Sequence, residues 1–370
     1  MIINSDKFLA YVSGKMCKGL TQKLLILFGT SCWLLLSSSV FALEEKSSAL
    51  KQVNAQVYVA FQKTALRFND SNVIIIEGDD SLVIVDANDN LENARMLVEE
   101  VKALSERLGS KPIEYVINTH WHSDHTLANA IYKQSFPQIR AFVGHQNLPE
   151  LIENKTIPQL EEKIKRYIVA IEKAEKELAA GTEDKELAQK IKNAKQLVAE
   201  FKQLDIPKPT ITFEHSMLLD FKGPKIELLN FGRAHTEGDT IVYLPEQKLL
   251  LSGDLFDQLP YAGHGYPSEW LHTLKSIEKL DFDSVVPGHG ALQKGKVRLN
   301  AIISLLEDAL DQAKSALNDK VPQEDFIKSI DLQVYKERLG PLDATGERAF
   351  GHFIPGFFER AYQEVNGEIK

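Results

Sequence analysis

The chain has 370 residues, of which 44% are hydrophobic and 26% charged, and its net charge at pH 7 is −9. This composition indicates a folded globular protein rather than a fibrous or disordered one, and the length allows one large domain or two ordinary ones. The acidic balance argues against sequence-independent binding to nucleic acid, because a phosphate backbone is held by clustered Lys and Arg.

Residues 1–42 differ from the rest and are typical of an export signal. Lysines precede the apolar run LLILFGTSCWLLLSSSVFA, and Val40 and Ala42 stand where a signal peptidase reads small residues. We therefore expect cleavage after Ala42 and a periplasmic or secreted protein without stable membrane insertion. An uncleaved N-terminal anchor is the alternative, since the apolar run is long for a signal. Cys17 and Cys32 both lie in this segment, so the mature chain has no disulfide or thiolate ligand.

The following sequence alternates between strand and helix patterns. The β-rich runs VYVAFQKTALRF and NVIIIEGDDSLVIVDA come first, and Gly78 to Asp80 form a predicted hairpin turn. A helical stretch then ends at Gly109 and is followed by the apolar strand IEYVIN. Later strands are predicted in ITFEHSMLLDF, KIELLNF, DTIVYLPEQKLLLSGDL and FDSVVPGHG. This alternation indicates an α/β layered fold.

Two segments are predicted to be helical throughout. Residues 149–204 are rich in Lys, Glu, Ala and Leu, and their apolar residues recur at helical spacing on both sides of Gly181. They predict a helical hairpin, which is either a solvated insert packed on the domain or a lid or dimerisation arm. Residues 296–370 predict a helical C-terminal region. The expected organisation is thus a signal peptide (1–42), a domain (43–295) carrying the insertion (149–204), and this C-terminal region.

A histidine cluster follows the strand IEYVIN. The stretch NTHWHSDHTLAN places His120, His122, Asp124 and His125 within six residues of a chain that has ten histidines. Imidazole and carboxylate are the ligands that zinc accepts where cysteine is lacking, and a loop leaving a strand can direct these positions to one point. An accidental group of histidines in a polar turn is the alternative, but the complete pattern is rare by chance.

Three further candidates for metal ligands stand at the ends of apolar strands. His235 follows KIELLNFGRA, Asp254 ends KLLLSGD, and His289 ends SVVPGHG. Each is a weak signal alone, because a single His after a strand is more often a hydrogen-bonded turn residue and Asp254 can cap a turn. Their combination in this order with the histidine cluster is a strong signal.

The order of these motifs resembles the metallo-β-lactamase superfamily over about residues 54–295, apart from the helical insert. The matching motifs are LVIVDA with Asp86, THWHSDH, GRAHTEGD, LLSGDLF and VVPGHG. The resemblance implies a four-layer αβ/βα sandwich with a two-metal site at one edge. It implies that His120, His122 and His235 bind one metal, that Asp124, His125 and His289 bind the other, that Asp254 bridges them, and that Asp86 fixes the histidine loop from behind.

Two zinc ions per chain are the expected cofactor. Two metals can share a water and lower its pKa, so that metal-bound hydroxide attacks the substrate while one metal polarises its carbonyl. Asp124 is the candidate catalytic residue, since it can handle the proton as the leaving group departs. Tyr261, His264 and Tyr266 lie in QLPYAGHGYPSEW between two ligand motifs. They either line a substrate groove or pack this loop onto the sandwich.

The expected function is that of an exported zinc-dependent hydrolase, which cleaves an ester, thioester, lactone or amide bond of a small molecule. One alternative is a true β-lactamase, although subclasses with a cysteine ligand carry it where this chain has Asp254. The other is an enzyme like the persulfide dioxygenases of the superfamily, which use one iron and a subset of these ligands. No nucleic-acid partner is expected, and the patterns leave the oligomeric state open.

Overall fold

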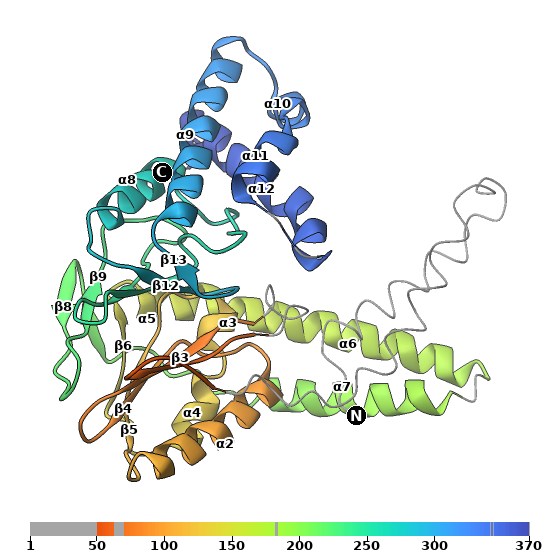
Figure 1. The fold of residues 1–370 in the computed structure, drawn as a ribbon. Coiled ribbons are helices and arrows are strands. Elements are labelled where there is room, and N and C mark those ends of the chain that lie inside the picture. Colours follow the sequence, from red (N-terminus) through yellow and green to blue (C-terminus); the bar gives the residue numbers. More distant parts are fainter. Residues whose placement is uncertain (1–49, 63–69, 182–183, 341, 343, 370) are drawn as a thin grey trace. The chain divides into compact units, whose positions relative to one another are not determined.

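The computed structural model describes residues 50–62, 70–181, 184–340, 342 and 344–369 (Figure 1). The predicted export signal and its cleavage site lie outside these residues. The chain divides into two compact units, of which one contains residues 157–205 and the other residues 48–156 and 206–370. In the ranges that the structure describes, no helix is both long and apolar enough to cross a membrane.

The first sheet of the larger unit has seven strands in sequence order. These are β1 (Lys51–Asn54), β2 (Val57–Ala60), β3 (Val73–Glu77), β4 (Leu82–Val85), β5 (Ile113–Ile117), β6 (Ala141–His145) and β7 (Ile211–Phe213). Strands β1 to β4 pair antiparallel, and β4 to β7 pair parallel. Parallel neighbours need a crossover, which helix α2 (Leu91–Arg107) provides between β4 and β5.

The second sheet has six strands in the order β13-β12-β11-β10-β9-β8. They are β8 (Ser216–Leu218), β9 (Glu227–Leu229), β10 (Ile241–Leu244), β11 (Leu249–Gly253), β12 (Ser284–Pro287) and β13 (Gln293–Lys294). Only β11 and β12 pair parallel, and helix α8 (Pro267–Ile277) connects them. The segments that follow β11 and β12 carry Asp254 and His289, so this pairing brings the two residues to one edge of the sheet.

The two sheets pack face to face and carry helices on their outer sides. One apolar cluster joins Ile74 and Val83 of the first sheet to Val242 and Leu251 of the second. A second cluster joins the other face of the second sheet to α8, α9 (Val297–Asn318) and α12 (Ala344–Val365). Helices α2 and α4 (Asn129–Ser135) lie beside the first sheet (Figure 1). The predicted four-layer αβ/βα sandwich is therefore confirmed.

The remaining helices of this unit are short or belong to the C-terminal region. They are α3 (Ser123–Thr126), α5 (Leu148–Leu151), the π-helix η1 (Ile152–Thr156), α10 (Gln323–Ser329) and α11 (Leu332–Leu339). In the C-terminal region, α9 and α12 pack together through buried side chains that include Leu306, Ala309, Phe357 and Phe358. The predicted helical C-terminal region is present.

The smaller unit is the predicted helical hairpin, formed by α6 (Ile157–Ala179) and α7 (Lys185–Phe201). Asp184 caps α7 by accepting a hydrogen bond from the Leu187 backbone N–H at 2.9 Å. The rings of Tyr167 and Phe201 meet edge to face, with 6.2 Å between their centroids. Residues 148–156, which precede the hairpin in the chain, form α5 and η1 of the larger unit.

Candidate metal centre

The loop that carries His120, His122 and His125 follows β5. Hydrogen bonds from side chains to its backbone hold its shape. The Asn118 side chain donates to the His125 carbonyl at 2.7 Å and exchanges hydrogen bonds with the side chain of Asn129. The Thr126 hydroxyl donates to the carbonyl of His122 at 2.9 Å. His120 therefore lies in the turn after the strand, while His125 lies in α3, and both side chains are buried.

One group of ligand-type atoms surrounds a point beside Asp254. His122 Nδ1 lies 3.0 Å from His120 Nε2 and 3.0 Å from His235 Nε2. Asp254 Oδ2 lies 3.8 Å from His120 Nε2 and 3.6 Å from His235 Nε2. One atom from each of these four residues lies within 4.8 Å of the others, as in a group that can hold a metal ion.

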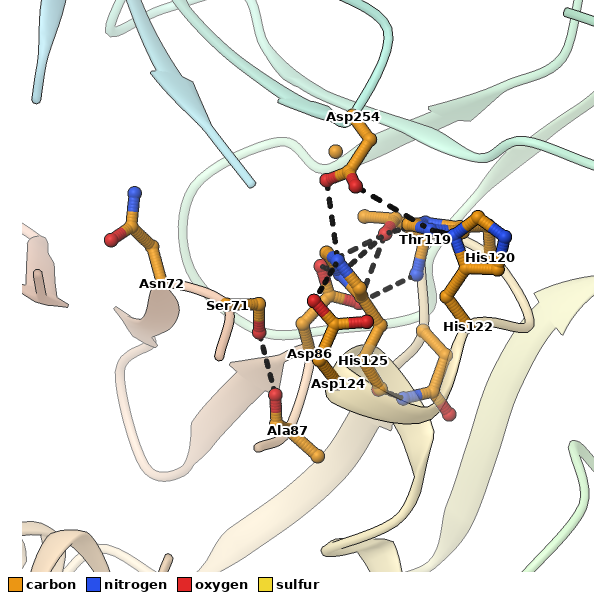
Figure 2. Close-up of polar contacts among 12 residues, drawn as sticks. Ser71, Asn72, Asp86, Ala87, Thr119, His120, His122, Asp124, His125 and Asp254 are labelled. Atoms are coloured by element: carbon orange, nitrogen blue, oxygen red, sulfur yellow. Dashed lines mark hydrogen bonds and ion pairs between the residues drawn. The ribbon is translucent and has the colours of Figure 1, made fainter. Parts of the chain in front are cut away.

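A second group lies on the other side of the same carboxylate. His289 Nε2 is 3.1 Å from Asp124 Oδ2, and His125 Nε2 is 3.6 Å from the same oxygen. Asp254 approaches both histidines, with 3.2 Å from Oδ1 to His125 Nε2 and 3.3 Å from Oδ2 to His289 Nε2. Asp254 is thus shared between the two groups, and Figure 2 shows it facing His120 and His125.

The donor atoms fit a divalent metal ion. Among the described residues, His125 Nε2 and Asp254 Oδ1 are buried without a well-aligned hydrogen bond, although they lie 3.2 Å apart. A buried polar atom left without a partner costs about 1 to 3 kcal/mol, which coordination would offset. Nitrogen and carboxylate oxygen donors without thiolate are a set that zinc accepts, and harder or redox-active metals accept it as well.

Burial and charge set the protonation of the ligand-type atoms. Burial lowers the pKa of His120 and His122 well below the usual range and lowers that of His235 to about 4. These imidazoles are therefore neutral at pH 7, which is the form that binds a metal. Burial acts to raise the pKa of Asp254, but His289 and His125 outweigh it and hold that pKa well below the usual range.

Asp86 lies behind the ligand-type residues and contacts the loop that carries them. Its Oδ2 lies 2.9 Å from His125 Nδ1, and its Oδ1 accepts a hydrogen bond from the Thr119 backbone N–H at 2.7 Å (Figure 2). The Thr119 hydroxyl lies 3.0 Å from His120 Nδ1. Asp86 has φ of 64°, a left-handed conformation that Asp and Asn tolerate better than most residues.

The residues predicted for a substrate loop divide between two environments. His264 lies beside His122, and its ring contacts that of Tyr261 with 5.7 Å between centroids. Tyr261 is 39% exposed, so part of this residue is accessible to solvent. Tyr266 instead donates to Glu237 Oε1 at 3.2 Å, and the Arg233 guanidinium lies 4.1 Å from its ring centroid. Of the three, Tyr261 and His264 have ring contacts with the ligand-type residue His122, at 6.5 Å and 5.0 Å between centroids.

Sequence reasoning missed several residues at the centre. Asp257 is buried, accepts a hydrogen bond from the His289 backbone N–H at 3.0 Å, and forms a ligand-type group with Asp254 and His289. The Asn72 side chain donates to the Pro287 carbonyl at 2.9 Å and to the Gly290 carbonyl at 2.9 Å, which fixes the loop of His289. Only the position of Asp257, three residues after Asp254, offered a signal.

Gly288 makes room for the shared carboxylate. A Cβ added to this residue would lie 2.0 Å from Asp254 Oδ1 and 3.1 Å from the Gly253 carbonyl carbon. We expect Gly288→Ala to displace Asp254 and to lower the metal affinity about tenfold. This is the lower end of the roughly 10- to 100-fold loss that follows when residues supporting a metal ligand are changed. Titration with Zn²⁺ against a chromogenic chelator measures this. Gly351→Ala in α12, where the added methyl meets nothing within 4 Å, is the control, and equal affinities in both variants would contradict the expectation.

The family of the chain follows from comparison with known proteins. The family model described as the metallo-β-lactamase superfamily matches residues 66–289, which is more than half of the chain. This range includes Asp86 and all the ligand-type residues described above. The protein belongs to the metallo-β-lactamase superfamily.

Individual relatives are distant. The linear primary-alkylsulfatase of Pseudomonas sp. (strain ATCC 19151) is 20% identical over an alignment of 278 residues that covers 70% of this chain and 49% of that protein. The metallo-β-lactamase type 2 of Bacillus cereus is 32% identical over 79 residues, 20% of this chain and 31% of that protein. A solved stereoselective inverting sec-alkylsulfatase from Pseudomonas sp. has a TM-score of 0.58 and 14% identity, and covers 87% of this chain and 51% of its own. The chain thus spans about half the length of these alkylsulfatases.

Proposed function

We propose that the protein is a hydrolase that depends on two zinc ions and cleaves an ester, thioester, lactone or amide bond. The observation that carries this proposal is the position of Asp254, whose carboxylate lies within 3.8 Å of histidines from both ligand groups. In the proposed centre His120, His122 and His235 would hold one ion, Asp124, His125 and His289 the other, and Asp254 both.

The chain's own residues have distinct tasks in this proposal. Two bound ions would supply an activated water and polarise the bond to be cleaved. Asp124 is the carboxylate suited to proton transfer, because 20% of its side chain is exposed, against 8% for Asp254. Asp254 is enclosed by histidines and would keep the ions together. Tyr261, at the exposed side, would contact the organic part of the substrate.

A sulfate ester is a second candidate substrate. The alkylsulfatase relative aligns with 70% of this chain, whereas the β-lactamase relative aligns with 20%. The greater extent of the first match favours a sulfate ester over a β-lactam, which remains an alternative. The other alternative is a single-iron enzyme like the persulfide dioxygenases. In such an enzyme one of the two ligand groups would hold no metal ion.

A substrate panel tests the proposed reaction. The purified protein is assayed with a lactone, a thioester, a carboxylic ester, an alkyl sulfate and a chromogenic cephalosporin, before and after chelation and after return of Zn²⁺. We expect hydrolysis of at least one of the first four, lost on chelation and restored by zinc. Hydrolysis of the cephalosporin alone would make the protein a β-lactamase. No hydrolysis by protein with two bound zinc ions would contradict the proposal.

Export is also part of the proposal and rests on the sequence of residues 1–42. When the full chain is expressed in a Gram-negative host, we expect the protein from the periplasmic fraction to begin at Leu43. N-terminal sequencing of that fraction measures this directly. A chain that retains residues 1–42 and sediments with the membranes would instead support the uncleaved anchor.

A further inference from the structure

The two ring nitrogens of His122 face different neighbours. Nδ1 faces the ligand group, at 3.0 Å from His120 Nε2 and 3.0 Å from His235 Nε2. Nε2 lies 2.9 Å from Nδ1 of His264. A ring nitrogen that binds a metal carries no proton, so the proton of neutral His122 belongs on Nε2. His264 Nδ1 then accepts the hydrogen bond from this N–H.

The other histidines of this ligand group have comparable contacts on their outer nitrogens. His235 Nδ1 lies 2.9 Å from the Tyr261 carbonyl, and His120 Nδ1 lies 3.0 Å from the Thr119 hydroxyl. Such contacts fix the tautomer and the ring orientation of a metal-binding histidine. His264 supplies the corresponding contact for His122. We propose that His264 is a positioning residue for His122, and that Arg360 of the C-terminal helix α12 holds His264 in place.

The segment around His264 needs support from outside. Gly263 and Gly265 flank His264, and glycine loses more conformational freedom on ordering than any other residue. The Gly265 carbonyl accepts two hydrogen bonds from Arg360, at 2.9 Å from Nε and 2.7 Å from Nη2. The planar guanidinium thereby fixes the direction of the peptide next to His264.

The same helix holds the start of α8. Glu364, one turn beyond Arg360, accepts hydrogen bonds from the backbone N–H and the hydroxyl of Ser268, both at 2.9 Å. The rings of Trp121 and Tyr261 border His264 at 5.0 Å and 5.7 Å between centroids. Helix α12 therefore fastens the loop on both sides of Tyr266, and the C-terminal region contributes to the geometry of the metal centre.

Metal affinity tests the role of His264 without any substrate. In the full mature protein, His264→Phe is expected to lower the affinity for the ion held by His120, His122 and His235 about 10- to 100-fold. The affinity for the other ion should not change. His264→Asn, whose amide oxygen can accept the same hydrogen bond, is expected to restore most of the affinity. Stepwise titration with Co²⁺, followed by visible absorption, measures both ions. His272→Phe, in α8, is the control for introducing a phenylalanine.

The tautomer of His122 provides a second readout. Long-range proton–nitrogen NMR of the zinc-loaded protein is expected to place the proton of His122 on Nε2, in slow exchange with water. In His264→Phe this proton should exchange rapidly. A His122 proton on Nδ1, or unchanged affinity and exchange in His264→Phe, would overturn the proposal. If His264→Phe does not fold, the proposal is tested by the metal affinity of His264→Asn and by the position of the His122 proton in the wild-type spectrum.

Arg360 is tested in parallel. Arg360→Gln is expected to lower the affinity for the same ion less than His264→Phe does. The variant loosens the segment around His264 but keeps the imidazole that contacts His122. Arg338→Gln, which removes an arginine that joins α11 to Ser304 and Asp308 of α9, is the matched control. Equal loss of affinity in both arginine variants would overturn the role of Arg360. The inference rests on the proposed metal centre but not on its reaction, so it survives if no substrate is hydrolysed.

Discussion

Asp254→Ala is expected to abolish tight binding of both metal ions at once. The Asp254 carboxylate lies 3.2 Å from His125 Nε2 and 3.6 Å from His235 Nε2, which belong to different ligand groups. Its removal would leave Asp124 as the one carboxylate among the other six ligand-type residues, so less negative charge would offset the charge of two cations. We expect the loss of affinity to exceed about 100-fold, the upper figure for removing a residue that merely supports a ligand.

The measurement is the number of zinc ions retained after dialysis against a weak chelator. Asp281→Ala is the control, since Asp281 is an exposed aspartate paired with Lys248 and carries the same charge. Hydrolysis of the preferred substrate should fall in step with the metal content. An Asp254→Ala protein that keeps two zinc ions would show that the carboxylate is not shared between them.

Asp86→Ala is expected to destabilise the fold and the metal centre together. It would leave His125 Nδ1 and the Thr119 backbone N–H buried without their acceptor. Breaking a buried charged pair costs about 3 to 5 kcal/mol of unfolding free energy. The metal held by His125 should bind about 10- to 100-fold more weakly, because the ring is no longer oriented.

Urea denaturation of the metal-free protein measures the first effect, and zinc titration measures the second. Asp86→Asn separates geometry from charge, since Asn tolerates the left-handed φ of 64° and keeps an acceptor for Thr119. We expect it to lose less stability than Asp86→Ala. If the alanine variant matched the wild type in both measurements, the supporting role of Asp86 would be wrong.

Much of the fold followed from the sequence because its signals are local. Residues close together in the sequence determine these signals. Examples are the strands VIIIE and LVIV and the helical periodicity of 157–201. The seven ligand-type residues could be found because each lies in a recognisable motif that follows an apolar strand. The structure brings them together around Asp254. The family model confirms the resemblance from which this arrangement was expected.

The remaining features depend on contacts between distant residues. Asn72 holds Pro287 and Gly290 across more than two hundred positions, and Arg360 reaches Gly265 across 95. Single polar residues of this kind are common in turns, so no spacing distinguishes them. The direction of Tyr266 towards Glu237 is likewise set by tertiary packing. The π-helix at 152–156 is also not marked by a simple residue pattern.

Elemental analysis of the purified mature protein tests the central claim most directly. The account predicts two zinc ions per chain after reconstitution, and their number should fall in Asp254→Ala but not in Asp281→Ala. One iron per chain in protein purified without added metal, with no second ion taken up from a zinc solution, would contradict the two-metal centre.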